Sequence, residues 1–203
     1  MIYEELYSFD AEQRALLGCI CGVDEAGRGP LAGPVCCAAV LFGGDERFEW
    51  LNDSKKVSEK RREVLFEQIK ENCVAYHIEL IDNNTIDELN ILGATMLGMK
   101  RCAEALMPYG AAAALIDGNR CPEAALHCVP VIKGDAHSAS IAAASVLAKV
   151  TRDRYMVQLD SEYPQYGFAV HKGYPTKAHY AALEAHGITP YHRRSFLKGR
   201  GLV

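Results

Sequence analysis

Residues 19–42 read CICGVDEAGRGPLAGPVCCAAVLF, two apolar runs separated by a segment rich in glycine and proline. The runs 19–27 and 34–42 are typical of buried strands, and the segment between them is typical of a turn. We therefore predict an antiparallel pair of strands at the start of the fold. Two adjacent acids, Asp24 and Glu25, end the first strand close to that turn.

Strands and helices are mixed along the rest of the chain. Apolar runs predict further strands at 74–81, 111–118 and 127–133. Helical spacing of apolar residues predicts a helix at 58–73, capped by Ser58, and further helices at 138–159 and 176–187. A capping box of Thr85 and Glu88 predicts the start of another helix, which runs through Ile91 to Leu106. Residues 163–176 are expected to form a loop. This order of elements indicates an α/β domain with a mixed sheet flanked by helices.

The composition is that of a globular protein. With 203 residues and 49% hydrophobic composition, the chain can bury a large core. Neither membrane insertion nor export is expected, because no apolar run reaches about 18 residues and the N-terminus is acidic and polar. The eight cysteines contain no C-x-x-C pair and are interpreted as small core residues, which favours the reducing cytoplasm.

Charge is distributed unevenly along the chain, although the net charge is only −4. Residues 163–203 carry six basic side chains against Glu184 alone. The basic residues are Lys172, Lys177, Arg193, Arg194, Lys198 and Arg200. This segment is expected to face phosphates, and the competing interpretation is a solvated basic tail.

Two more aspartates, Asp117 in LIDGN and Asp135 in IKGDAH, stand in settings similar to that of Asp24-Glu25. Clustered carboxylates repel one another, and a divalent cation such as Mg²⁺ or Mn²⁺ is the simplest way to keep them ionised. Taken singly, Asp117-Gly118 is more typical of a turn, and Asp135 is explained by a helix dipole. Asp153 is left outside the site because an ion pair with Lys149 accounts for it.

Three other segments have both a functional and a structural interpretation. The glycines around Arg28 fit neither the dinucleotide fingerprint nor the phosphate loop, and they allow either close approach to a ligand or a tight hairpin. Tyr174, between Gly173 and Pro175, either stacks on a sugar or base or packs within its loop. Lys55 belongs either to a turn before a helix or to a phosphate contact.

Taken together, these segments resemble ribonuclease HII, the type 2 ribonuclease H of bacteria, over nearly the whole chain. The matching blocks, in the order of that family, are GVDEAGRGPLAGPV, LNDSKKVSEKRRE, LIDGN, IKGDAHSASIAAASVLAKVTRDRYM, YGFAVHKGYPTKAH and HRRSF. The resemblance implies a ribonuclease H-like fold with a C-terminal helical segment. It implies a catalytic domain over 1–162 and a basic substrate-binding segment over 163–203 packed on the same domain.

The resemblance also implies a chemistry. Asp24, Glu25, Asp117 and Asp135 would ligate Mg²⁺ or Mn²⁺, and the substrate would be RNA within an RNA/DNA duplex or a single ribonucleotide embedded in DNA. Hydrolysis on the 5′ side of the ribonucleotide would leave a 3′-hydroxyl and a 5′-phosphate.

Substrate recognition is implied by the same resemblance. Gly27-Arg28-Gly29 would read the 2′-hydroxyl, Tyr174 would stack on the following deoxyribose, and Lys55 would contact a phosphate.

Two alternatives stay open on the sequence. The first is a catalytically silent module that binds RNA/DNA hybrids, against which the four intact carboxylates argue. The second is a metal-dependent hydrolase of small phosphate esters, which would need neither the Gly27-Arg28-Gly29 loop nor the Tyr174 loop. We expect a monomer, because nothing in the sequence demands a larger assembly.

Overall fold

The structure is a computed structural model that describes residues 1–54 and 56–198. Within these residues the strands are β1 (Ile20–Ala26), β2 (Val35–Leu41), β3 (Ala75–Ile81), β4 (Ala113–Asp117) and β5 (His127–Val131). The α-helices are α1 (Glu4–Leu17), α2 (Glu59–Asn72), α3 (Asn83–Ala105), α4 (Ala139–Glu162), α5 (Phe168–His171), α6 (Lys177–His186) and α7 (Arg194–Leu197). Short 3-10 helices are η1 (Met107–Tyr109), η2 (Gly134–Ala136) and η3 (Pro164–Tyr166).

The strands form one mixed sheet in the order β3-β2-β1-β4-β5. Strand β2 is antiparallel to both β1 and β3, so the predicted hairpin is confirmed. Strands β1, β4 and β5 are parallel, so the predicted mixed sheet is also confirmed. Because β1 and β4 are parallel neighbours, their carboxyl ends lie at the same edge of the sheet.

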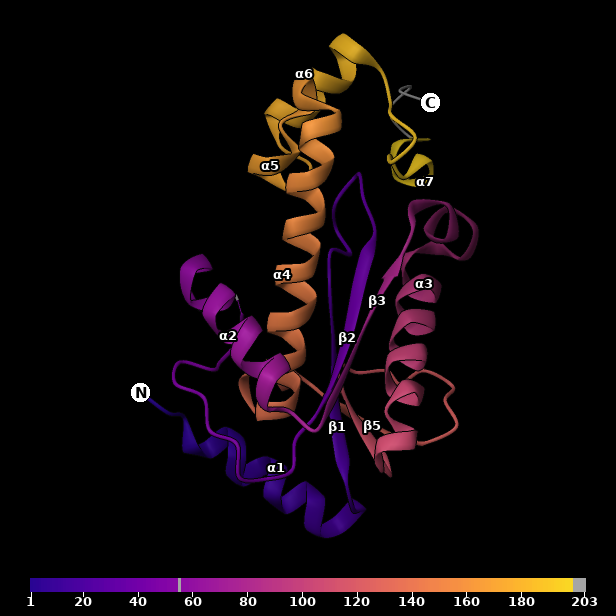
Figure 1. Cartoon of the computed structure of the whole chain (residues 1–203). Helices are drawn as coiled ribbons and strands as arrows, with labels where there is room; N and C mark the ends of the chain where they lie inside the picture. The colour runs from indigo at the N-terminus through magenta and orange to yellow at the C-terminus, as the bar shows by residue number, and fades with distance from the viewer. Residues whose placement is uncertain (55, 199–203) are drawn as a thin grey trace.

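Helices cover both faces of this sheet, with α4 on one face and α3 on the other (Figure 1). Strand β2 is buried along its whole length, and its side chains alternate between the two cores. Cys36, Ala38 and Val40 pack in the core that contains α4 and α2, and Cys37, Ala39 and Leu41 pack in the core that contains α3. The apolar run in the sequence therefore reflects burial on both faces.

Helix α4 lies unusually close to β1. A side chain at Gly22 would come within 2.2 Å of the backbone of Ser140, so only glycine fits at this crossing. The first turn of α4 is held by the buried carboxylate of Asp10, which accepts hydrogen bonds from Ser138 Oγ (2.6 Å) and from the backbone N–H of Ser140 (2.8 Å). Helix α1 thus holds the first turn of α4, the helix that packs against β1.

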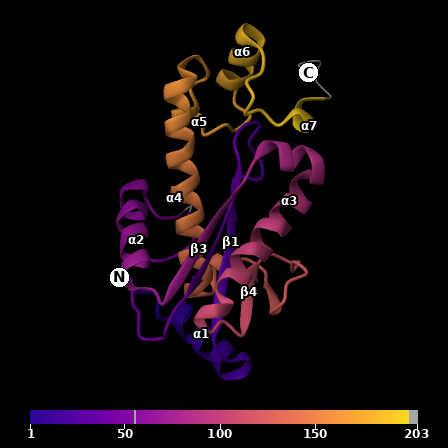
Figure 2. The same ribbon diagram turned by 45° about the vertical axis from the view of Figure 1, so that its right-hand side comes forward.

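The C-terminal elements gather beyond the sheet, with α5 and α6 around the distal end of α4 and α7 beside the start of α3 (Figures 1 and 2). Their apolar side chains share a core with Leu31 and Ala32 of the β1–β2 connection and with Met156 and Leu159 of α4. The prediction of a plain loop over 163–176 was wrong, because η3 and α5 lie within it. Stacked aromatic rings, such as Tyr166 on Phe168 at 5.3 Å, stabilise these short turns. The division of the chain at residue 162 stays a prediction.

Helix α3 differs from its sequence-based prediction in two respects. The predicted capping box of Thr85 and Glu88 was wrong, because Asp82 is the N-cap and accepts the N–H of Thr85 (2.8 Å). The helix is also kinked at Asn90, whose φ is +60° and whose Oδ1 accepts the N–H groups of Leu92 and Gly93. Asn90 therefore begins a new helical segment within α3.

Other expectations hold with small corrections. Helix α2 follows Ser58 as predicted, but the Ser58 side chain makes no capping hydrogen bond. All eight cysteines are free, and Cys19 is exposed, contrary to its predicted place in the core. Among the described residues, no helix has both the length and the apolar character to span a bilayer.

Candidate functional site

Three of the four predicted acids meet where β1 and β4 end. Asp24 and Glu25 lie near the end of β1, and Asp117 ends β4, whose Ile116 is paired with Val23. One carboxylate oxygen from each residue lies within 4.8 Å of the other two. The parallel pairing of β1 and β4 thus brings together residues that are more than ninety positions apart in the sequence.

Burial and crowding make this cluster electrostatically costly. Asp24 is buried, and desolvation, followed by the charges of Glu25 and Asp117, holds the pKa of its carboxyl well above the usual range. Hydrogen bonds from Ser145 and from the backbone N–H of Glu25 (2.7 Å) act in the opposite direction. A bound cation would relieve this repulsion, and three hard oxygen donors fit a divalent ion.

Asp135 lies outside this group of three carboxylates. It is buried in η2, directly after Gly134, whose backbone N–H donates to Asp117 Oδ1 (2.6 Å). The fold thus brings the Asp135 segment up to the cluster through Gly134, and the part of Asp135 as a fourth ligand stays a prediction.

The Gly27-Arg28-Gly29 turn is held from behind by a buried arginine. Arg193 is 0% exposed and donates to the carbonyls of Gly27 (2.7 Å), Arg28 (2.9 Å) and Gly33 (2.9 Å). Burial and the neighbouring Arg152 lower the pKa of Arg193 to about 9, so its guanidinium stays charged at neutral pH. Arg193 was expected in a phosphate-facing segment, and its burial shows that it supports the turn instead.

A second buried arginine joins the end of the β1–β2 connection to the Tyr174 loop. Arg152 donates to the carbonyls of Pro34 (2.9 Å), Ala32 (3.2 Å) and Lys172 (3.0 Å). Gly27 has a φ of +93°, and a side chain there would come within 1.9 Å of Arg152 Nε. Glycine is therefore required at this position both by the backbone conformation and by the packed guanidinium.

The carboxylates, the glycine turn and Tyr174 line one cavity of about 350 Å³. Its lining is Asp24, Glu25, Ala26, Gly27, Arg28, Gly29, Ser54, Asp117, Ser145, Lys149 and Tyr174. Tyr174 is 42% exposed and lies near Gly29, and Arg28 Nη1 lies 3.5 Å from Glu25 Oε1. The fold therefore places the ring, the turn and the acids around one space.

A neighbouring cavity of about 300 Å³ continues from this site. It shares Glu25, Arg28 and Asp117 with the first cavity and adds Asn119 and Arg120 from the loop after β4. Arg28 and Arg120 therefore line the cavity beside the carboxylates. Their positive charge would attract a phosphate there.

Several residues of the site were missed or undervalued in the sequence. Ser145 of α4 contacts Asp24 and exchanges a 2.8 Å hydrogen bond with Ser54 Oγ. Lys149 lines the cavity and forms the predicted ion pair with Asp153 (2.6 Å). The sequence signal for these two residues was their spacing, since Ser145 and Lys149 are four positions apart in a helix of small apolar residues. Lys55 lies outside the described residues.

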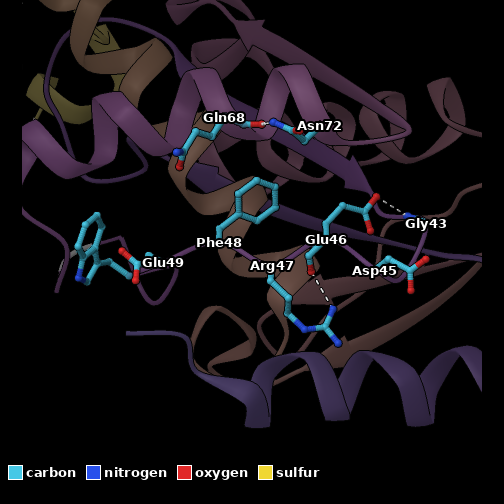
Figure 3. Close-up of a pocket in the computed structure, with 9 residues that line it drawn as sticks. Gly43, Asp45, Glu46, Arg47, Phe48, Glu49, Gln68 and Asn72 are labelled. Atoms are coloured by element: carbon cyan, nitrogen blue, oxygen red, sulfur yellow. Dashed lines mark hydrogen bonds between the residues drawn. The ribbon is translucent and has the colours of Figure 1, made fainter.

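A cavity of about 620 Å³ lies between the 43–50 segment and α2 (Figure 3). There Glu46 accepts the backbone N–H groups of Gly43 and Gly44, both at 2.7 Å, and Arg47 donates to the carbonyl of Glu46 at 2.8 Å. Glu46 and Arg47 therefore satisfy the local backbone. It shares no lining residue with the carboxylate site, so volume alone does not mark the functional centre.

A family model described as ribonuclease HII matches residues 21–199. The chain belongs to the ribonuclease HII family. It is 56% identical over 180 residues to ribonuclease HII of Dechloromonas aromatica, covering 89% of this chain and 91% of that protein. It is 53% identical to ribonuclease HII of Clostridioides difficile, covering 87% of this chain and 69% of that one.

Solved structures agree with this membership. Ribonuclease H2 of Pyrococcus horikoshii superposes with a TM-score of 0.70 at 23% identity, covering 90% of this chain and 96% of that one, which confirms the ribonuclease H-like fold. The RNase HII in the PCNA complex of Archaeoglobus fulgidus superposes with a TM-score of 0.66 at 28% identity, covering 82% of this chain and 87% of that one.

Family membership establishes the broad activity. The chain is a ribonuclease H, an endonuclease that acts on the RNA strand and depends on a divalent metal. The silent hybrid-binding module is therefore not supported, and the family to which this chain belongs acts on nucleic acid.

Proposed function

We propose that this protein cuts RNA/DNA hybrids within the RNA strand and also cuts on the 5′ side of single ribonucleotides embedded in duplex DNA. The products would be a 3′-hydroxyl and a 5′-phosphate. The observation that carries this proposal is the shared cavity, in which the carboxylate cluster, the Gly27-Arg28-Gly29 turn and Tyr174 lie together.

Asp24, Glu25 and Asp117 would hold the divalent ion, Mg²⁺ or Mn²⁺, with Asp135 as a fourth ligand. When bound, such ions supply a Lewis acid that activates water and stabilises the leaving oxygen of a phosphodiester. Ser145 would orient the Asp24 carboxylate through its hydrogen bond.

Discrimination between RNA and DNA requires a test of the 2′-hydroxyl, which both donates and accepts hydrogen bonds. The Gly27-Arg28-Gly29 turn would make this test, because Arg193 binds its carbonyls and Arg152 packs against Gly27 beside the acids. Tyr174 would stack on the deoxyribose that follows the ribonucleotide, and Lys55 would contact a phosphate.

One experiment tests the function directly. An end-labelled DNA duplex with a single ribonucleotide is incubated with the protein in EDTA, in Mg²⁺ and in Mn²⁺, and the cut is mapped. We expect a single cut 5′ of the ribonucleotide that requires metal, and no cut in the all-DNA duplex. A cut elsewhere, or cleavage in EDTA, would contradict the proposal.

Tyr174→Ala is expected to separate the two substrates. Loss of a stacking ring costs about 1–3 kcal/mol, or roughly fivefold to 150-fold, where the ring meets one sugar at a junction. Cutting at a single ribonucleotide should fall by this factor, while cutting of a long hybrid should fall less, because a long hybrid has many equivalent registers. The rates on both substrates are measured together, with Tyr109→Ala, an exposed tyrosine after α3, as the control. Equal losses on both substrates would count against this role.

Asp24→Asn is expected to stabilise the cation-free protein while it removes activity. The raised pKa of Asp24 means that its ionised form costs stability, and this cost grows as the pH rises above about 4, where an unfolded carboxyl ionises. In EDTA the variant should melt a few degrees higher at pH 8, with a smaller difference at pH 5. Added Mg²⁺ should raise the melting temperature of the wild type more than that of the variant. A variant that is less stable than wild type in EDTA at pH 8 would refute this electrostatic account.

A further inference from the structure

Three histidines lie behind the Tyr174 loop. His179 of α6 and His192, just before α7, are buried, and their Nε2 atoms are 3.0 Å apart. His171 of α5 stacks on His179 with ring centroids 4.5 Å apart. The carbonyl of Tyr174 lies 3.0 Å from His179 Nδ1, so the cluster reaches the backbone of the residue whose ring enters the cavity.

One backbone donor, the N–H of Thr189, decides which nitrogen of His192 and then of His179 carries the proton. The N–H of Thr189 donates to His192 Nδ1 (2.9 Å), so this nitrogen is an acceptor and the proton of a neutral His192 is on Nε2. His192 Nε2–H then donates to His179 Nε2, which leaves the His179 proton on Nδ1, pointing at the carbonyl of Tyr174. Each step follows from the one before it.

Both rings are neutral, as this chain of hydrogen bonds requires. Burial lowers the pKa of His179, and burial together with His179 lowers the pKa of His192 to about 4. A second proton on His179 would sit on Nε2 and face the Nε2–H of His192 across the 3.0 Å contact. A second proton on His192 would sit on Nδ1 and face the N–H of Thr189 at 2.9 Å.

The Tyr174 loop needs such an anchor. Lys172 and Gly173 both have positive φ angles, +51° and +81°, so the loop turns sharply just before the tyrosine. Arg152 binds the carbonyl of Lys172 (3.0 Å), and the N–H of Leu31 binds the carbonyl of Gly173 (2.8 Å). The carbonyl of Tyr174 also accepts the backbone N–H of Thr176 (2.9 Å). The bond from His179 adds a side-chain donor from α6 to this carbonyl.

We infer that His192 and His179 form a hydrogen-bond relay, from Thr189 N–H to the Tyr174 carbonyl, that positions the Tyr174 ring for cutting at single ribonucleotides. This inference rests on the role of Tyr174 given under the proposed function and extends it to residues that do not line the cavity. His179 and His192 are positioning residues, since they act through the Tyr174 backbone.

Two substitutions at His179 separate positioning from general packing. In His179→Asn the amide nitrogen takes the place of Nδ1 and still donates to the Tyr174 carbonyl, whereas in His179→Gln the amide takes the place of Nε2 and that bond is lost. We expect His179→Gln to lower single-ribonucleotide cutting relative to hybrid cutting by about tenfold, the worth of one lost hydrogen bond, and His179→Asn to keep most of the ratio. A role in packing alone would lower both substrates equally in both variants, which would overturn the inference.

A spectroscopic measurement on the wild-type protein tests the relay without any substitution. The ¹⁵N shifts of the histidine rings report which nitrogen is protonated, and the chain has seven histidines to assign. We expect His179 protonated on Nδ1 and His192 on Nε2 at pH 7, and the opposite tautomer at either ring would overturn the relay.

Tyr174→Ala distinguishes the two ways of failing. If Tyr174→Ala separates the substrates and His179→Gln does not, the relay is refuted while the role of Tyr174 stands. If Tyr174→Ala lowers both substrates equally, the role of Tyr174 fails, and the ring tautomers alone decide whether the relay exists. If both variants separate the substrates, the double variant should show no further loss, because the two residues act through one loop.

Discussion

Replacement of Asp117 by asparagine is expected to abolish cleavage while leaving binding of an RNA/DNA hybrid largely intact. Asp117 supplies one of the three carboxylates that meet within 4.8 Å, and an amide is a weaker ligand for a hard cation than a carboxylate. The amide oxygen can still accept the N–H of Gly134, so the loop before α4 should keep its place. We expect turnover to fall by about a thousandfold or more, as for removal of a group that stabilises transition-state charge.

Single-turnover cleavage and fluorescence anisotropy with a labelled hybrid measure the two quantities separately. Asp45→Asn is the matched control, because Asp45 is an exposed aspartate that lines the 620 Å³ cavity and not the carboxylate site. It should leave both quantities unchanged. Turnover by Asp117→Asn at the wild-type rate would remove Asp117 from the metal site.

Replacement of Arg193 by methionine is expected to have the second largest effect, on both stability and recognition. The variant keeps an unbranched side chain but removes the donors to the carbonyls of Gly27, Arg28 and Gly33. Bonds from a charged donor are worth about 1.5–3 kcal/mol each, offset in part by the relief of a buried charge, so we expect a net loss of about 2–4 kcal/mol. For a chain of this size that corresponds to a fall of roughly 5–15 °C in melting temperature.

Arg194→Met is the matched control for this prediction. Arg194 is the next residue and is exposed, and its contact with Asp87 is made by its backbone N–H, so the variant should melt within about 2 °C of wild type. Thermal unfolding and cutting at a single ribonucleotide are measured for both variants. Similar losses for the two arginines would mean that the glycine turn does not depend on Arg193.

Much of the fold could be predicted from the sequence because its strands are short apolar runs with clear ends. Residues 19–42 predicted the β1–β2 hairpin, and β3, β4 and β5 were each found in their predicted segment. Capping and short turns were predicted less well. The start of α3 could be capped by Asp82 or by the pair Thr85 and Glu88. The structure uses Asp82, because β3 ends at the residue before it.

The carboxylates were predictable for a similar reason. An acid at the end of an apolar strand is a recognisable pattern, and parallel pairing makes two such ends meet, as with Asp24 and Asp117. Arg152 and Arg193 carry no comparable pattern, because a basic residue in a polar segment looks the same whether its guanidinium faces solvent or a set of buried carbonyls. Their burial depends on packing between β1–β2, α4 and α7, which lie far apart in the sequence.

The sequence by itself determined the mixed α/β architecture, the strand-end acids and the family, because these depend on local patterns of apolar, acidic and glycine residues. Only the tertiary structure decided how the recognition elements are held. Arg193 satisfies backbone carbonyls of the Gly27-Arg28-Gly29 turn, and Arg152 and His179 satisfy backbone carbonyls of the Tyr174 loop. A buried carbonyl must find a donor, and which side chain supplies it is settled only when distant segments pack together.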